Sequence, residues 1–313
     1  MNKRLAILAA LLAASVLLFL FCPLGDWRFN LPQRAQTLPV MLLVGTAIGL
    51  ATIVFQTLTT NRLLTPSIIG LDALYLLLQM AVIFLLGATA YLKTPPLWKY
   101  YTDTALLMLA AALLFGLFLP LLARDIYRLL LVGIIFGVLC SKLTELMGRM
   151  LDPTDYTYYQ GVAYAQFNRV KPASLLLPAS GFILAAAGYL WHKRYALDII
   201  ALGREHAINL GVPYHRDLFC LMLAVSLLTA TATALAGPVV FFGLLVSALT
   251  YRLIPSPHHA VTLPAAALLA AIILVLGQTV FERVFNLGGT LSVVIEGLGG
   301  LVFLYLLLAG KRP

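Results

Sequence analysis

The densest group of reactive side chains lies in the segment ALGREHAINLGV, residues 201–212 of a 313-residue chain. Its polar members, which stand between two glycines, are Arg204, Glu205, His206 and Asn209. Such side chains offer charges and hydrogen bonds to a partner. Gly203 and Gly211 bracket a helix-compatible stretch, and Pro213 prevents its continuation. The spacing therefore predicts a helix of about two turns.

The apolar residues of this short helix are compatible with two roles. A helix of this length is not stable alone, so Ala207, Ile208 and Leu210 are expected to pack against something. The helix is either a surface connector whose apolar residues lie against a bilayer, or a docking knob for a cytoplasmic partner. The pattern by itself favours neither role.

A second group of charges lies within an apolar run. Lys142, Glu145 and Arg149 are three and four residues apart, so they share one face of a helix and can pair. Charges inside a membrane span are costly and usually functional. The stripe is either part of a solute pathway or a self-neutralised charge ladder near the outer end of its span. Asp72 and Glu296 lie near span ends and are assigned no catalytic role.

Catalytic and metal sites are not indicated. The sequence lacks G-x-S-x-G and H-E-x-x-H motifs. The adjacent His258 and His259 have no further ligands at metal spacing, so we predict a solvated turn there. Cys22, Cys140 and Cys220 lie in or beside apolar runs and are interpreted as packing residues. We therefore expect a protein that is not an enzyme and that binds no metal.

The composition specifies the elements that must position these residues. The chain is 62% hydrophobic and 11% charged, against about 25% charged residues in a soluble domain. Its apolar runs are continuous rather than alternating, which excludes a barrel and leaves helices of about 20 residues as the spanning elements. We predict an all-α, polytopic membrane protein with about ten transmembrane helices. The windows are residues 5–22, 38–58, 67–92, 104–123, 129–148, 173–191, 218–236, 238–253, 261–279 and 290–309.

The arrangement of loops predicts an orientation. Residues 5–22 are too long for the apolar core of a signal peptide and are kept as a span. An even number of spans puts both termini on one side, and the basic residues weakly favour the cytoplasm. Two longer polar segments remain, residues 149–172 on the outer side and residues 192–217 on the inner side. The outer segment is expected to carry a short interfacial helix with tyrosines at the depth of the lipid headgroups. Residues 1–313 are treated as a single transmembrane domain, and the net charge of +9 is attributed to orientation rather than nucleic-acid binding.

The segment ALGREHAINLGVP resembles the cytoplasmic loop of the FecCD family, the permease subunits of ATP-binding-cassette importers for iron chelates and vitamin B12. In that family a Leu-Gly-Glu-x-x-Ala-x-x-Leu-Gly pattern forms the coupling helices. The matching residues are Leu202, Gly203, Ala207, Leu210 and Gly211, with Arg204 and Glu205 covering the acidic position.

Three other segments carry the resemblance over nearly the whole chain. LLVGTAIGLATIVFQTLTTNRLLTPSIIG is similar to the family's second and third spans, ALAGPVVFFGLLVSALTYRL to its eighth and GTLSVVIEGLGGLVFLYLLL to its last. The chain departs from the pattern at Arg62, where a proline is expected, and at Ser247 and Ala248, where Pro-His is expected. GLDALYLLLQ together with DP…YQG…YAQFN looks most like the ferric-siderophore branch.

The resemblance implies a type II ABC importer permease fold and a set of partners. Two permease subunits form the pathway, and we expect the second to be a paralogue, with a second copy as the alternative. Two cytoplasmic ATPase subunits would bind the coupling helices, and a periplasmic siderophore-binding protein would deliver the chelate. The chain has no G-x-x-x-x-G-K-[ST] loop, so ATP and magnesium would be held by the ATPase and no cofactor directly by this chain. The implied location is the bacterial inner membrane.

The resemblance also implies roles for individual residues. Arg34 and Arg283 fall near positions that dock the binding protein, although each could equally be an interfacial arginine that reaches headgroups. The translocation pathway is assigned to Gln56, Lys142, Glu145 and Arg149.

An ion-coupled secondary transporter for a small polar solute is the main alternative. It would use Asp72 and Glu296 as ion sites and would need discontinuous helices directed at them. It leaves the match at residues 201–212 unexplained.

Overall fold

The computed structural model describes residues 2–21, 27–122, 126–167, 173–284 and 291–309, and every regular element in these ranges is a helix. The elements are α1 (Asn2–Phe21), α2 (Trp27–Thr59), η1 (Pro66–Ile69), α3 (Leu71–Lys93), α4 (Pro96–Leu122), α5 (Ile126–Met150), α6 (Pro153–Ala163), α7 (Ala173–His192), α8 (Arg194–Ile200), α9 (Arg204–Asn209), α10 (Tyr214–Ala236), α11 (Phe242–Leu253), α12 (His259–Val284) and α13 (Leu291–Ala309). Each predicted window overlaps one main helix, in order α1, α2, α3, α4, α5, α7, α10, α11, α12 and α13, of which α11 has only 12 residues. In the described parts of the chain, seven helices are long and apolar enough to cross a membrane. The all-helical, multi-span prediction is confirmed.

The boundaries differ where backbone conformation interrupts an apolar run. The predicted third window is split, because η1 ends before the helix of α3 begins at Leu71. The predicted eighth window begins too early, since α11 starts at Phe242. α10 ends at Ala236 because Gly237 adopts a φ of 103° and Pro238 has no N–H to donate. Hydropathy does not detect either break.

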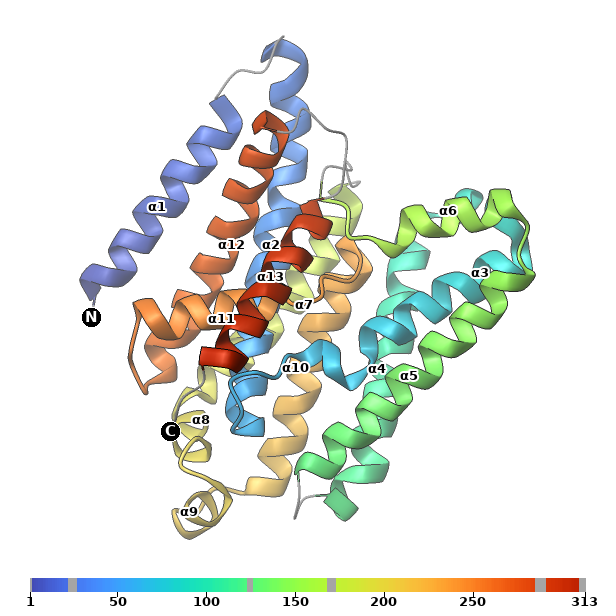
Figure 1. Ribbon diagram of the computed structural model, residues 1–313. Coiled ribbons are helices and arrows are strands. Elements are labelled where there is room, and N and C mark those ends of the chain that lie inside the picture. Colours follow the sequence, from blue (N-terminus) through green and yellow to red (C-terminus); the bar gives the residue numbers. More distant parts are fainter. Residues whose placement is uncertain (1, 22–26, 123–125, 168–172, 285–290, 310–313) are drawn as a thin grey trace.

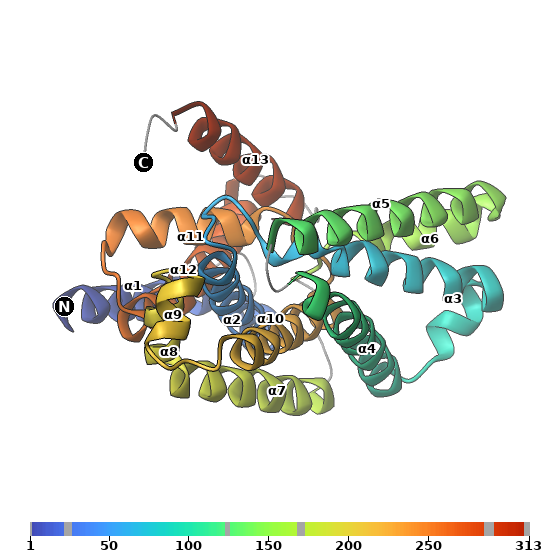
Figure 2. The ribbon, with the colours of Figure 1, turned by 90° about the horizontal axis from the view of Figure 1, so that it is seen from below.

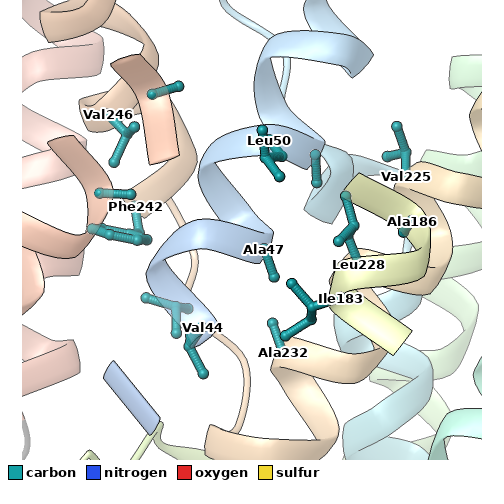
Figure 3. Close-up of a cluster of buried hydrophobic side chains, with 14 of the residues drawn as sticks. Val44, Ala47, Leu50, Ile183, Ala186, Val225, Leu228, Ala232, Phe242 and Val246 are labelled. Carbon is teal, nitrogen blue, oxygen red and sulfur yellow. The ribbon is translucent and has the colours of Figure 1, made fainter. Parts of the chain in front are cut away.

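The core is built around α2, which packs against α10 on one side and α12 on the other (Figure 1). Small residues allow these helices to approach closely. At Gly49 an added Cβ would lie 2.7 Å from the carbonyl oxygen of Ala266 in α12. Figure 3 shows the apolar side chains that fill the space between α2, α7, α10 and α11, among them Ala47, Ile183 and Leu228. Of the seven candidate spans in the described residues, α2, α10 and α12 are the most buried.

A second region extends to one side of this core. α3 packs against α5 and α6, and α4 connects the group to α10 (Figure 1). Much of α5 is exposed, including Leu131, Ile135, Leu139 and Leu146. We call α3, α5 and α6 the lateral group.

The two predicted polar segments lie at opposite ends of the molecule. The segment with α6 lies at one end, and α8 and α9 lie at the other, below α2, α10 and α12 (Figures 1 and 2). The predicted short helix in residues 149–172 is found as α6. Its tyrosines are not all at the surface, however. Tyr159 is buried against Met80 and Ile83 of α3, so this side chain packs inside the protein and not at the headgroups.

Candidate functional site

The connection from α7 to α10 forms one compact element at an end of the bundle. The Leu202 amide donates to the Ile199 carbonyl oxygen at 3.1 Å, and the Gly203 amide to the Ile200 carbonyl oxygen at 3.0 Å. These bonds join the end of α8 to the start of α9. The Val212 amide closes the far side by donating to the Ala207 carbonyl oxygen at 3.0 Å. We call residues 194–211 the α8–α9 unit.

The two glycines fix the geometry of this unit. Gly203 has a φ of 103° and Gly211 a φ of 80°, a region that costs a residue with a Cβ about 1–2 kcal/mol. An added Cβ would meet no atom within 4 Å at either position. The requirement for glycine is therefore conformational rather than steric, and the predicted glycine-bracketed helix is found at α9.

The apolar residues in and next to α9 differ in exposure. Ala207 is buried, whereas Ile208 is 44% exposed and Leu210 is 61% exposed. Ala207 packs against the protein, and Ile208 and Leu210 remain available to a bilayer or to a partner, the two roles that the sequence leaves open. Leu202 is exposed beside them, and so are Arg204 and Glu205. The result is an apolar tip bordered by charges.

The base of the unit is firmly anchored. Leu197 and Ile200 of α8 belong to the main apolar core. Lys193, just before α8, donates to Asp217 of α10 at 2.8 Å. The tip therefore projects from a support that is continuous with the core.

The histidine pair was predicted incorrectly in part. His258 has an exposed side chain, as expected of a solvated turn. His259 is buried and bonds to Asp198 of α8, with 2.6 Å between Nδ1 and Oδ1. Sequence reasoning missed this contact because the two residues are 61 positions apart. The described residues contain no group of three or more His, Cys, Asp or Glu side chains placed to hold a metal.

The charges on α5 pair as their spacing predicts. Lys142 Nζ lies 2.9 Å from Glu145 Oε2, and Arg149 Nη2 lies 2.6 Å from Glu145 Oε1. The side chains of Lys142 and Arg149 are 73% and 75% exposed. The ladder thus lies on the open face of the lateral group.

Gln56 is not part of that face. Its side chain is buried and donates to the Ser247 hydroxyl at 2.9 Å and to the Arg62 carbonyl oxygen at 2.6 Å. It joins the end of α2 to α11 and to the loop after α2. The structure does not bring Gln56 together with the ladder, and the pathway assignment of these residues stays a prediction.

The start of α2, which carries Arg34, and the end of α12, which carries Arg283, lie at the end of the molecule opposite the α8–α9 unit (Figure 1). Arg34 Nη2 is 3.3 Å from Glu282 Oε2, and Arg34 also donates to the Phe19 carbonyl oxygen at 2.8 Å. Arg283 follows Glu282 in the last turn of α12. The structure therefore pairs Arg34, whose side chain is only 12% exposed, with Glu282. The docking role of the two arginines stays a prediction.

Two free cysteines are described, Cys140, which is buried, and Cys220, which is partly buried. Cys22 lies outside the described residues. Asp72 is buried at the first turn of α3 and accepts a hydrogen bond from Thr233 of α10 at 3.1 Å.

These features define a class of protein, a multi-pass helical membrane protein whose buried core carries a projecting unit at one end. Residues 6–309 match the FecCD transport family, and the chain belongs to this family.

Relatives support the membership along the whole chain. The petrobactin import system permease protein YclO of Bacillus subtilis (strain 168) is 37% identical over 311 residues, which cover 99% of this chain and 98% of that protein. The petrobactin import system permease protein FatC of Bacillus anthracis is 27% identical over 276 residues, covering 88% and 78%. The fold is also that of a solved structure described as an inward-facing metal-chelate type ABC transporter, with a TM-score of 0.83, 21% identity and coverage of 99% and 100%. The predicted family and permease fold are confirmed.

Proposed function

We propose that this chain is the membrane-spanning permease subunit of an ATP-binding-cassette importer that moves a ferric siderophore from the periplasm to the cytoplasm, with petrobactin as the first candidate. The observation that carries the proposal is the projecting α8–α9 unit in a chain that is similar end to end to a petrobactin permease. The proposed location is the bacterial inner membrane, with α9 and both termini on the cytoplasmic side.

The α8–α9 unit would bind an ATPase subunit. Leu202 and Leu210 offer apolar area to a groove of that subunit, and Arg204 and Glu205 offer charges at the rim. Ala207 anchors the helix, while Gly203 and Gly211 set its direction. ATP and magnesium would be bound and hydrolysed by the ATPase, because this chain has no phosphate-binding loop.

The ladder on α5 would face the pathway. Exposed charges inside a span are costly against acyl chains, so the face that carries them is expected to meet water or a second permease subunit. Lys142 and Arg149 would then meet an anionic chelate, with Glu145 holding their positions. Gln56 is buried and would contribute to the pathway by holding the end of α2 to α11.

The opposite end of the bundle would dock the periplasmic binding protein. Arg34 and Arg283 lie there beside Glu282. Acidic groups of the binding protein would compete with Glu282 for the Arg34 guanidinium, which favours a docking contact that depends on salt.

An ion-coupled secondary transporter is the second candidate, and one observation favours it. The break between η1 and α3 places the buried Asp72 at the start of a helix, as in carriers with discontinuous helices.

Uptake in the native cell tests the proposal. Deletion of this chain should abolish the uptake of radiolabelled iron presented as ferric petrobactin, and uptake should be restored by the wild-type chain. Depletion of ATP should stop the restored uptake, whereas an ionophore that leaves ATP intact should not. Uptake that follows the ion gradient instead would favour the secondary transporter, and uptake that survives deletion would reject petrobactin as the substrate.

A further inference from the structure

The α8–α9 unit can drive transport only if its displacement reaches the helices of the core. Besides the packing of Leu197 and Ile200 in the core, two sets of polar side-chain contacts link α8, or the residue just before it, to those helices. One is the Lys193–Asp217 ion pair to α10. The other runs from Asp198 through His259 to Thr57, and it links three elements that are distant in sequence.

Asp198 and His259 form the first link of that second connection. Asp198 lies in the middle of α8, and His259 is the first residue of α12. Asp198 Oδ1 accepts from the His259 backbone N–H at 2.7 Å and lies 2.6 Å from the ring Nδ1. One carboxylate oxygen thus holds both the start of the helix and its side chain. Rotation or translation of α8 must therefore move the end of α12 or break two short bonds.

His259 and Thr57 form the second link. His259 Nε2 lies 2.7 Å from the Thr57 hydroxyl in the last turns of α2. That hydroxyl is also 2.9 Å from the Ile53 carbonyl oxygen, which can only accept. A neutral imidazole has one ring N–H, which lies on Nδ1 because the Asp198 carboxylate can only accept, so Nε2 accepts when the Thr57 proton points to it rather than to Ile53. The imidazole joins α8 to α2 as well as α12.

Burial makes this connection stiff. The His259 side chain is 6% exposed and the Asp198 side chain 21% exposed. Water competes poorly for bonds in such a place, and a broken bond leaves a buried polar group unpaired. α2 and α12 are also among the most buried helices of the molecule. A displacement passed to them is passed to the centre of the bundle.

We infer that Asp198, His259 and Thr57 are positioning residues for coupling, which transmit movement of the α8–α9 unit to α2 and α12. This inference rests on the proposed function and specifies how the same site would work. None of the three residues needs to touch the ATPase or the chelate. Their loss should leave the exposed tip intact, so the ATPase should still bind and hydrolyse ATP while less substrate moves per ATP.

The experiment uses the complete transporter, purified from its own membranes with its ATPase subunits and reconstituted in liposomes with the binding protein and ferric petrobactin. The quantity measured is ATP hydrolysed per iron transported. Asp198→Asn should raise this ratio about tenfold, the change that about 1.4 kcal/mol of lost differential stabilisation gives. A variant that merely destabilises the protein would lower both rates together and leave the ratio unchanged.

Two substitutions at His259 separate the links. Asparagine places an amide nitrogen near the position of Nδ1, and glutamine places one near Nε2. His259→Asn keeps the bond to Asp198 and loses the bond to Thr57, so its ratio should lie between those of the wild type and Asp198→Asn. His259→Gln loses the side-chain bond to Asp198 and should behave like Asp198→Asn. His258→Gln is the matched control, because His258 is 62% exposed and its Nδ1 is 3.5 Å from Asp198 Oδ2; its ratio should be that of the wild type.

The outcomes distinguish this inference from the proposed function. A wild-type complex without ATP-dependent uptake would overturn the proposed function. A wild-type complex that transports normally, with Asp198→Asn and His259→Gln at the wild-type ratio, would overturn the inference alone. Equal uncoupling by His258→Gln would also overturn it, because a general loss of charge near α8 would then explain the effect.

Discussion

The two charged clusters of this protein lie in opposite settings. The Asp198–His259 cluster is mostly buried and joins three helices of the core, whereas the Lys142–Glu145–Arg149 ladder is exposed and confined to one helix. Their surroundings differ in the same sense, since 61% of the most apolar stretch of α12, which carries His259, is buried against 11% of that of α5. A buried cluster between elements can fix their relative positions. An exposed cluster within one helix does little for the fold and remains available to a solute or a partner.

The same contrast separates the core from the lateral group. The core places the α8–α9 unit on deeply buried helices. The lateral group presents an open, partly charged face. Force transmission and solute contact would thus be assigned to different regions of one chain.

The largest effect is expected at the exposed tip of the α8–α9 unit, which projects from the buried core. Gly211→Val should reduce siderophore uptake by about a hundredfold or more, because valine cannot readily adopt a φ of 80° and α9 would be redirected. The amount of protein in the membrane should be unchanged. Gly188→Val is the control, since Gly188 lies within α7 and an added Cβ there meets no atom within 4 Å. Normal uptake by Gly211→Val would count against a coupling role for α9.

The end opposite the tip should show a smaller effect. The double substitution Arg34→Glu and Arg283→Glu should weaken binding of the periplasmic protein about tenfold, since two attractive charges become repulsive ones beside Glu282. Binding can be measured by surface plasmon resonance with the detergent-purified transporter. Arg252→Glu at the end of α11, on the α9 side, should leave the affinity unchanged. An unaltered affinity in the double variant would remove these arginines from the docking site.

A matched pair of lysines tests the contrast in stability directly. Lys193→Gln leaves the Asp217 side chain, only 4% exposed, without its cation and should lower stability by about 1–2 kcal/mol. Lys142→Gln removes a lysine that is 73% exposed and should have no measurable effect. Thermal unfolding of both variants in the same detergent measures the difference. Equal shifts in Tm would mean that burial does not distinguish the Lys193–Asp217 pair from the Lys142–Glu145 pair.

The smallest effect is expected from the exposed ladder. Glu145→Gln releases Lys142 and Arg149 from their shared carboxylate, so an anionic chelate should be bound more tightly. The KM for uptake should fall by up to about threefold with Tm unchanged, which initial-rate measurements over a range of chelate concentrations would reveal. A higher KM would contradict a direct contact between these cations and the chelate.

The sequence predicts the long helices well because their signal is local. Each window of about 20 apolar residues corresponds to one helix, and glycines at 203 and 211 correctly bracket α9. The failures involve information that is not local. The start of α11 depends on the backbone at Gly237, and burial of His259 depends on Asp198, 61 residues away.

Site-directed cross-linking at the tip tests the central claim most directly. Leu210→Cys would be introduced into a chain whose Cys22, Cys140 and Cys220 are replaced by alanine, and a short thiol cross-linker would be added to inverted membrane vesicles that contain the whole transporter. We predict a covalent adduct with the ATPase subunit whose yield changes when ATP is bound. A thiol at this position that yields no such adduct, but reacts with a membrane-impermeant reagent added to the outside of intact spheroplasts, would contradict the account.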